Sequence, residues 1–367
     1  STPDKTCFVE NGVPYIKMYN LRNQKIDFAY HPQYITEEVH NGKLQRSRTE
    51  VGDLIMNIVG PPLGKLAIIP TTLPQANFNQ AAVLIRPYKF KEVLVSYLKV
   101  YLEEMSEINS IATRGSAGQV NISLTQSQNM RIPIPPLNEV RRIIEEVSKY
   151  DILIDSLKQN ITDIQNLIAY TKSKILDLAI HGKLVPQDPN DEPAIELLKR
   201  INPDFTPCDN GHYTQLPEGW AICKMKQITS ITNGKSQKNV ETLNGIYPIY
   251  GSGGVIGRAN QYLCIAGSTI IGRKGTINNP IFVEEHFWNV DTAFGLKAND
   301  AILDKYLYYF CLSFDFSKLD KSTAMPSLTK TSIGNVLIPI PPYKEQERIV
   351  AKIDMVLDTM NEILRAV

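Results

Sequence analysis

The chain has 367 residues, a length typical of two or three domains. Hydrophobic residues make up 43% and charged residues 21%, which excludes a disordered chain. No run of about 18 apolar residues occurs and the first residues carry no secretory pattern, so neither a membrane span nor a secretory signal is expected. The net charge of +1 gives no global attraction to nucleic acid or lipid. Five scattered cysteines without a Cys-x-x-Cys pair are typical of free thiols in a reducing cytoplasm.

Two globular parts are predicted, over residues 1–135 and 216–343. Short apolar runs broken by Gly, Pro and Asn indicate strands of a mixed sheet in both parts. These runs are 53–59, 66–69, 81–85, 269–271 and 281–283. Helices are expected over 90–111 and 301–316. A linker with a short helix at 194–201 fills residues 183–215, and Leu-Pro-Glu-Gly-Trp at 216–220 opens the second part.

An internal repeat organises the chain. Residues 129–143 read NMRIPIPPLNEVRRI and residues 335–349 read NVLIPIPPYKEQERI, with nine identities in fifteen positions at an offset of 206. Weaker echoes match 123–125 with 327–329 and 52–55 with 267–270. In both copies, a loop rich in small and polar residues precedes a Ser-Leu-Thr segment that we expect to be a strand. The chain is therefore predicted to contain two copies of one unit, in which a globular part leads through a Pro-rich strand end into a helix.

The first copy ends in a long predicted helix, over residues 136–182. No Pro or Gly occurs from Glu139 to His181, Asn138 is the expected N-cap, and Gly182 is the expected stop. Apolar residues recur at alternating steps of four and three, which is the heptad seam of a coiled coil. The seam runs through Ile143, Val147, Tyr150, Ile154, Leu157, Ile161, Ile164, Ile168, Thr171, Ile175 and Leu178, of which only Thr171 is clearly polar. At 1.5 Å per residue the stretch from Glu139 to His181 alone would be about 65 Å long, so it needs a partner helix.

The second copy supplies that partner, over residues 344–367. Its seam residues lie 206 positions after those of the first helix. We expect the two helices to pair through Ile143, Val147, Ile154, Leu157 and Ile161 of the first and Ile349, Ile353, Val356, Met360 and Ile363 of the second. Because the second helix is short, part of the first is left without a partner in the chain. The predicted fold class is α+β, with two mixed globular domains joined by two long helices that pair as a coiled coil.

Charge is unevenly distributed along the chain. Residues 1–135 and 216–343 carry a small excess of Lys and Arg, whereas 136–215 and 344–367 carry an excess of Asp and Glu. This pattern suits two nucleic-acid-facing modules on an acidic rod. From charge alone, solvated faces without function are the simpler explanation of so small an excess.

Motifs of catalysis are weak in this sequence. Residues 250–257 miss the third glycine of a dinucleotide-binding loop, and residues 60–66 are one residue short of a P-loop. Pro341-Pro342-Tyr343 evokes the Asn/Asp-Pro-Pro-Tyr loop of amino-methyltransferases, but Ile340 replaces its polar residue. The five histidines lack metal-ligand spacing and are expected at the surface or as helix caps. No catalytic or metal-binding residue is predicted.

Basic and polar side chains in Gly-rich loops are the candidates for contact with DNA, because Arg, Lys, Asn and Gln reach base edges and phosphates. In the first globular part they are Lys43, Arg46, Arg48, Lys65, Arg114, Ser116, Gln119 and Asn121. In the second they are Lys235, Ser236, Gln237, Lys238, Ser252, Arg258, Arg273, Lys274, Lys321 and Ser322. From these residues alone, ordinary surface loops are an equally good interpretation.

Three segments together resemble one known family. The repeated Ile-Pro-Ile-Pro-Pro block, the segment KILDLAIHGKLVPQD at 174–188 and the Leu-Pro-Glu-Gly-Trp opening resemble the specificity (S) subunit of type I restriction–modification systems. The first globular part lacks that opening, so we expect a truncated first domain. A coiled-coil scaffold that binds only protein is the main alternative, and an enzyme is a third.

The resemblance implies a function and a set of partners. Each globular part would be a target-recognition domain that reads one half of a split sequence in double-stranded DNA. The two helices would pair antiparallel, space the half-sites and dock two methyltransferase (M) subunits, which restriction (R) subunits would join. S-adenosylmethionine and ATP would belong to those partners, and this chain would hold no cofactor and catalyse nothing. Such a complex would work in the cytoplasm of a prokaryote, away from membranes.

Overall fold

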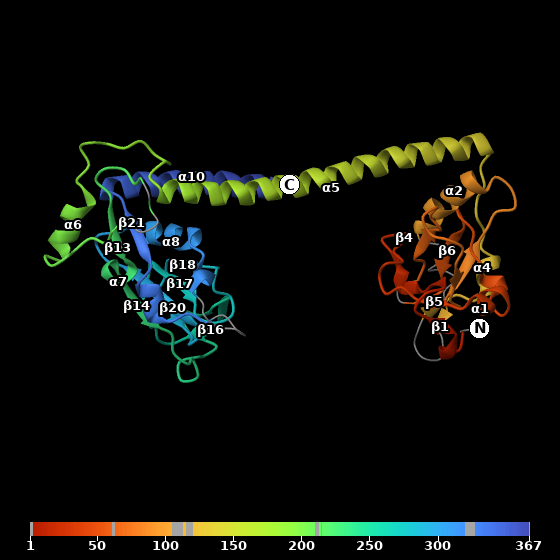
Figure 1. The fold of residues 1–367 in the computed structure, drawn as a ribbon, viewed down its shortest axis with the longest axis horizontal. Helices are drawn as coiled ribbons and strands as arrows, with labels where there is room; N and C mark the ends of the chain where they lie inside the picture. The colour runs from red at the N-terminus through yellow and green to blue at the C-terminus, as the bar shows by residue number, and fades with distance from the viewer. Residues whose placement is uncertain are drawn as a thin grey trace. The chain divides into compact units, whose positions relative to one another are not determined.

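The computed structural model describes residues 3–60, 63–104, 113–114, 120–209, 213, 215–319 and 327–366. The chain divides into two compact units, Ser1–Leu157 and Lys158–Val367 (Figure 1). Each unit combines a mixed sheet structure with helices, which confirms the predicted fold class. Among the described residues, every helix falls short of the apolar length that a bilayer-spanning segment requires.

The first unit is built on an antiparallel sheet with β6 at its centre. Its strand order is β10–β6–β8, and apolar residues of α2 pack on it, so that Leu54, Met56, Val95 and Leu102 share one core. The strands are β1 (Phe8–Val9), β2 (Val13–Ile16), β3 (Leu21–Arg22), β4 (Lys25–Ile26), β5 (Tyr34–Ile35), β6 (Leu54–Asn57), β7 (Val59–Gly60), β8 (Leu66–Ile68), β9 (Asn77–Phe78), β10 (Ala82–Ile85), β11 (Thr113–Arg114) and β12 (Val120–Asn121). The helices before the long one are α1 (Glu37–Asn41), α2 (Lys91–Glu103) and α4 (Leu124–Gln128).

The second unit contains a four-stranded antiparallel sheet of order β14–β20–β17–β18, with α8 packed on it. A second sheet has the order β16–β15–β19, and β13 pairs with β21. The strands are β13 (Ala221–Lys224), β14 (Thr229–Asn233), β15 (Tyr247–Gly251), β16 (Gly254–Ala259), β17 (Ser268–Gly272), β18 (Ile281–Val283), β19 (Trp288–Asn289), β20 (Ala293–Ala298) and β21 (Leu337–Ile340). The shorter helices are α6 (Ala194–Ile201), α7 (Met225–Ile228), α8 (Asp304–Ser313) and α9 (Lys330–Gly334).

The predicted duplication is present in the fold. β2 pairs in parallel with β9 in the first unit, and β15 pairs in parallel with β19 in the second. β6 and β17 each follow a glycine with positive φ, Gly52 at 78° and Gly267 at 76°, which is the conformation that glycine adopts at least cost. The hydroxyl of Tyr97 donates to the carbonyl of Pro133 at 2.7 Å, and that of Tyr306 donates to the carbonyl of Pro339 at 2.9 Å.

Two details of the repeat differ from the prediction. Residues 123–125 were expected to form a strand, but Ser123 caps the short helix α4, and Thr329 caps α9 in the same way. Each hydroxyl accepts a hydrogen bond from the third residue of its helix, as an N-cap does. Ser123 and Thr329 are therefore the equivalent residues, at the offset of 206, and 123–125 does not correspond to 327–329. The helices predicted over 90–111 and 301–316 are the shorter α2 and α8, and residues 105–112 lie outside the described part.

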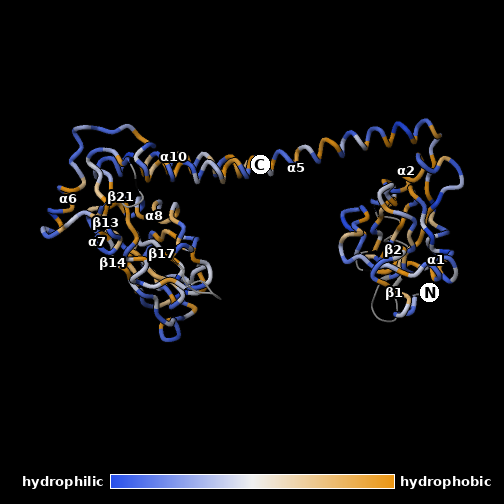
Figure 2. Tube along the Cα trace, viewed as in Figure 1, coloured by the Kyte–Doolittle hydropathy of each residue, from blue (hydrophilic) through white to orange (hydrophobic). Residues whose placement is uncertain are grey.

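The long helix α5 spans Leu137–Ile180 and α10 spans Tyr343–Ala366. Hydrophobic residues recur along α5 (Figure 2). Gly182 ends the helix with φ +66°, as predicted. Asn138 was expected to be the N-cap, but it lies in the first turn, because the amides of Glu139 and Val140 already donate to the carbonyl of Pro136.

Within the second unit α10 runs antiparallel to the C-terminal part of α5. Glu345, at the start of α10, binds Gln187 just beyond α5, whereas Asn361, near the end of α10, binds Lys172. Ile349 and Ile353 are completely buried in a core that includes Leu176, Ala179 and Ile180.

This direction changes which residues of α5 can pair with α10. The five α5 residues predicted for pairing lie N-terminal to the stretch that α10 contacts, since the overlap starts from the C-terminal end of α5. Ile154 and Leu157 are 47% and 53% exposed, and Ile143, Val147 and Ile161 are partly buried. On α10, Met360 is buried, Val356 is partly buried and Ile363 is 43% exposed.

The repeated Glu and Arg have a structural role in the second unit. Glu345 is 1% exposed and accepts hydrogen bonds from Gln187 at 2.8 Å and from the indole of Trp220 at 3.1 Å. Burial raises the pKa of Glu345, against the effect of these two donors. Arg348 forms an ion pair with Asp191 at 2.6 Å. The motif therefore ties the linker and the Leu-Pro-Glu-Gly-Trp opening to α10.

A buried carboxylate joins the sheet of the first unit to its helix α2. The side chain of Asp53 is 0% exposed, and it pairs with Arg86 at 2.5 Å and with Lys91, on the first turn of α2, at 2.7 Å. Burial would raise the pKa of Asp53, but the hydrogen bonds from Arg86 and Lys91 outweigh it and lower that pKa. The ion pair of Lys297 with Asp304 joins β20 to α8 in the second unit.

Candidate nucleic-acid interface

Two basic loops of the second unit leave the same edge of its main sheet. β14 and β17 are both antiparallel to β20, which lies between them, so their carboxyl ends point the same way (Figure 1). Lys235 lies two residues beyond β14, and Arg273 and Lys274 directly follow β17. The sheet topology therefore brings together loops that are nearly 40 residues apart in the sequence.

Residues Trp288–Thr292, which run from β19 toward β20, hold these loops by their backbones. The amide of Lys235 donates to the carbonyl of Asn289 at 2.9 Å, and the amide of Arg273 donates to the carbonyl of Thr292 at 2.7 Å. The amide of Val290 donates to the carbonyl of Tyr250 at 3.0 Å, which attaches the β15–β16 hairpin and its turn residue Ser252. We call Lys235, Ser252, Arg273 and Lys274 the basic edge.

Two glycines allow the loops to pack this closely. A Cβ on Gly234 would lie 1.9 Å from the carbonyl oxygen of Val290, and one on Gly272 would lie 1.9 Å from that of Thr276. Neither position could hold a side chain without moving the backbone. The sequences Asn-Gly-Lys and Gly-Arg-Lys therefore lie where β14 and β17 end in closely packed backbone.

The cations of the basic edge are available to a ligand. Lys235 and Lys274 are exposed, and Arg273 is partly buried with its guanidinium 5.9 Å from the ring centre of Phe294. Among the described residues, none of the three forms a salt bridge within 4.0 Å. Asp291 is the exposed acidic residue on the segment that holds them. Unpaired cations on a fixed backbone are suited to phosphates and base edges.

The other predicted residues of the second unit lie around or away from this edge. Ser236 and Lys238 are exposed on the loop after β14, and Gln237 is partly buried there. Arg258 lies toward the far end of β16, opposite Pro248, and its guanidinium donates to the carbonyl of Ile246. Lys321 and Ser322 lie outside the described residues.

In the first unit, those predicted residues whose side chains the structure describes do not form one cluster. Lys43 and Arg46 are exposed, and the guanidinium of Arg48 donates to the carbonyl of His40 and the side chain of Asn41. Lys65 is bound through its amide to Asn57, at the opposite end of β6 from Asp53. Asn121 is partly buried in β12. Ser116, Gln119 and the side chain of Arg114 lie outside the described residues.

Sequence analysis missed a buried asparagine at the same place in both units. Asn289 on β19 and Asn77 on β9 are both 0% exposed. Asn77 donates to the carbonyl of Leu44 at 2.8 Å and to the hydroxyl of Ser47 at 2.9 Å, and so holds the loop that carries Lys43 and Arg46. A polar residue inside an apolar strand, as in Phe-Trp-Asn-Val, was the available signal.

His40 is a correction, because it was expected at the surface or as a cap. It is 5% exposed, and its ring nitrogens lie 2.6 Å from Asn77 Oδ1 and 3.2 Å from Gln75 Oε1. A neutral ring donates from one nitrogen only, so the short contact assigns the proton to Nδ1, which donates to Asn77 Oδ1.

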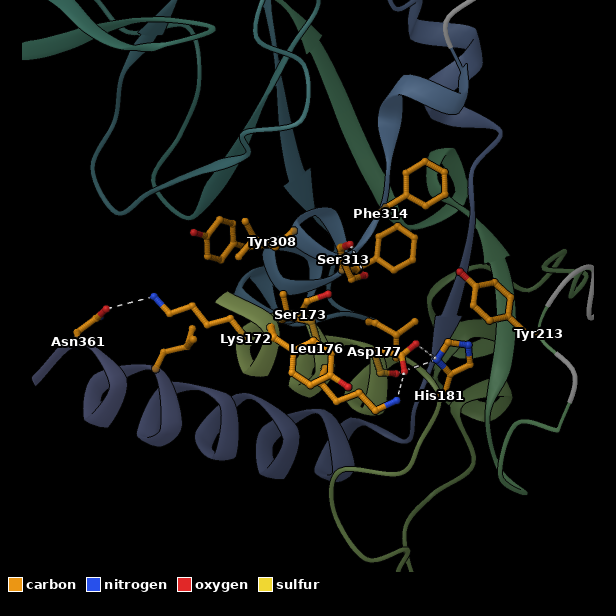
Figure 3. Close-up of a pocket in the computed structure, with 16 residues that line it drawn as sticks. Lys172, Ser173, Leu176, Asp177, His181, Tyr213, Tyr308, Ser313, Phe314 and Asn361 are labelled. Carbon is orange, nitrogen blue, oxygen red and sulfur yellow. Dashed lines mark hydrogen bonds and ion pairs between the residues drawn. The ribbon is translucent and has the colours of Figure 1, made fainter. Parts of the chain in front are cut away.

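A cavity of the second unit lies elsewhere, between α5, α8 and α10 (Figure 3). It has a volume of about 870 Å³ and is lined by apolar and aromatic side chains such as Leu176, Tyr308 and Phe314. Asp177 and His181 also line it, with Nδ1 of His181 3.1 Å from Oδ1 of Asp177. Within the described part of the chain, no group of three His, Cys, Asp or Glu side chains could hold a metal ion. Residues 250–257 form the β15–β16 hairpin, which also excludes a dinucleotide-binding loop there.

Comparison with known proteins identifies the family of this fold. The model described as the type I restriction modification DNA specificity domain matches residues 1–166 and 217–367. The chain belongs to this family. The specificity subunit of the type I restriction enzyme EcoAI from Escherichia coli is 25% identical over 338 residues, which cover 68% of this chain and 57% of that subunit. The putative MjaX specificity subunit from Methanocaldococcus jannaschii is 21% identical over 369 residues, which cover 96% of this chain and 82% of that one.

Two solved structures share the fold of this family member. The HsdS subunit of Thermoanaerobacter tengcongensis has a TM-score of 0.61 at 18% identity, covering 96% of this chain and 85% of that one. A chain from a study of complex assembly and conformational transition in the type I restriction–modification system has a TM-score of 0.64 at 20% identity, covering 96% and 86%. The resemblance inferred from the repeated block, the central helix end and the Leu-Pro-Glu-Gly-Trp opening is confirmed.

Proposed function

We propose that this specificity-family chain is the DNA sequence-recognition subunit of a type I restriction–modification complex. Each globular unit reads one half of a bipartite duplex target, and the helices set the spacing of the halves. The observation that carries the proposal is the basic edge, where Lys235, Arg273 and Lys274 project from backbones fixed by Trp288–Thr292. Because the backbones of these loops are fixed, their exposed cations would meet the base edges of the DNA in a defined register.

The exposed part of α5 supports a docking role for protein partners. Tyr150, Leu153, Ile154 and Leu157 are each between 47% and 59% exposed, and they lie beyond the stretch that α10 contacts. An apolar helix surface of this kind is typical of an interface. We infer that methyltransferase subunits, two in number, dock on the helices and that restriction subunits join them. S-adenosylmethionine and ATP then bind to those subunits, and this chain contributes recognition without catalysis.

Selection from a random pool tests the proposal. The chain, mixed with a type I methyltransferase subunit, is incubated with random-sequence duplex DNA, and bound duplexes are sequenced. We expect enrichment of one bipartite sequence with two fixed blocks. Equal retention of selected and scrambled duplexes would contradict recognition. A chain that retains the methyltransferase subunit but no DNA at low salt would favour the protein-scaffold alternative.

Two substitutions at the basic edge separate base readout from phosphate contact. Arg273→Ala is expected to weaken binding of the selected duplex by about 1–3 kcal/mol and to relax the preference at one base position, because a bidentate base contact is lost. Lys274→Gln is expected to weaken all duplexes alike and to lower the salt dependence by about one counterion. Binding titrations against single-base variants at several salt concentrations measure both effects. If Arg273→Ala weakened all sequences equally, Arg273 would be a phosphate contact instead.

A further inference from the structure

The loops of the basic edge come from distant parts of the chain, so their relative position depends on what joins them. Lys235, Arg273 and the Tyr250 hairpin have separate origins in sequence, and each is bonded to the segment Trp288–Thr292. A change in this segment would therefore shift several DNA-facing groups at once. None of its residues was among the predicted DNA contacts.

Trp288 makes a hydrogen bond in addition to its packing in the core. Its side chain is 8% exposed and lies with Val240, Ile249, Ala259 and Val290 in a small core cluster. Its indole N–H donates to the carbonyl of Lys235 at 3.0 Å, while the amide of Lys235 donates to the carbonyl of Asn289 at 2.9 Å. Both backbone groups of Lys235 are thus held by β19, and its ammonium remains exposed.

Asn289, the next residue, holds β19 in place through its buried side chain. It is 0% exposed, its side-chain Nδ2 donates to the carbonyl of Ala293 at 3.1 Å, and its Oδ1 accepts from the thiol of Cys264 at 3.2 Å. Burial raises the pKa of Cys264 to about 12, so the thiol keeps the proton that it donates at neutral pH. The position of β19 is therefore set by interior bonds before any ligand is present.

We propose that Trp288 is a specificity-determining positioning residue, whose indole N–H holds the Lys235 loop in register with the Arg273 loop on the DNA. The proposal rests on the proposed function of the basic edge. A loop that is free to shift keeps its charge and still attracts phosphates, but its side chains no longer meet the same base edges. Loss of the bond should therefore reduce discrimination between sequences more than overall affinity.

The other tryptophan supplies a matched control. The sequence contains two tryptophans, and the indole of Trp220 also donates one hydrogen bond, to Glu345 at the start of α10. Trp288→Phe and Trp220→Phe therefore each remove one indole N–H and keep an aromatic ring. Loop positioning is affected by the first substitution, whereas the second affects the attachment of α10.

The test compares the full chain and both variants, with the methyltransferase subunit present, on the duplex selected by the unchanged chain and on scrambled duplex. Trp288→Phe is expected to reduce the ratio of selected to scrambled binding by about tenfold, with binding of scrambled duplex unchanged. Trp220→Phe is expected to lower the unfolding temperature and leave that ratio unchanged. The benzothienyl analogue of tryptophan, which has the same shape but no N–H, replaces Phe if Trp288→Phe does not fold.

The outcomes separate this proposal from the function on which it rests. If the unchanged chain prefers no duplex, the proposed function fails. If it is selective and the folded Trp288 variant, whether Phe or the benzothienyl analogue, keeps its ratio, recognition stands and the positioning role is overturned. An equal loss of selectivity in Trp288→Phe and Trp220→Phe would also overturn it, since general loss of stability would then explain both.

Discussion

Replacing Ile353 by Ala is expected to lower the free energy of unfolding of the second unit by about 3 kcal/mol. Ile353 is 0% exposed and lies with Leu176, Ala179 and Ile180 in the core shared by α10, α5 and α8. Removing a buried isoleucine side chain to Ala costs about 2–5 kcal/mol, because apolar burial is lost and a cavity remains. Urea unfolding of the full chain, followed by circular dichroism, measures the change.

Ile363→Ala is the control, because it lies on the same seam of α10 but is 43% exposed. It should cost less than about 1 kcal/mol, since most of the side chain already contacts water. Equal costs at the two positions would contradict the antiparallel pairing of α10 with the C-terminal part of α5. A greater cost for Ile363→Ala would point to a different overlap of the two helices.

Replacing Asp53 by Asn is expected to cost about 2–3 kcal/mol at neutral pH. The carboxylate is buried and binds both Arg86 and Lys91, so its neutral replacement leaves these two cations with only Glu50, whose side chain is 57% exposed, as counterion. We expect less than the full cost of breaking a buried pair, because the side chain of Arg86 remains 36% exposed. Thermal unfolding of the first unit, compared with the unchanged chain, measures the loss.

The pH dependence of this effect has a defined sign. The folded pKa of Asp53 is lowered, so its stabilisation is present above the unfolded value of 3.8 and is lost as the pH falls through the folded value. The difference in stability between the unchanged chain and Asp53→Asn should therefore disappear in acid. Asp27→Asn is the control, since Asp27 is 46% exposed and lies 3.8 Å from Arg22, and its cost should stay below about 0.5 kcal/mol. A gap that stays constant down to about pH 3 would contradict the ion-pair explanation.

The sequence predicted the elements that depend on local pattern. The apolar runs became β6, β8, β10, β17 and β18, and the Pro-free heptad stretch became α5, because periodicity and Pro or Gly act within a few residues. The repeated block located both copies of the fold. Resemblance of three motifs in order was enough for the family, which the comparison confirms.

Properties that depend on distant contacts could not be predicted. Identical seams in α5 and α10 do not reveal where the helices overlap, since that depends on Glu345 meeting Gln187 at the far end of α5. Likewise, Lys235 and Arg273 were chosen as basic residues in Gly-rich loops, but no local pattern shows that β19 joins them. The buried Asn77, Asn289 and His40 were missed because their burial follows from tertiary hydrogen bonds.

The pairing of β13 with β21 means that the second unit can complete its fold only late in synthesis. Residues 221–224 leave the ribosome more than a hundred positions before their strand partner at 337–340, and Ile349 and Ile353 follow later still. Until then the nascent second unit exposes the edge of β13 and the apolar side of α8. Molecular chaperones that shield such surfaces during translation would therefore raise the yield of folded chain, and slower translation before residue 337 would lower it.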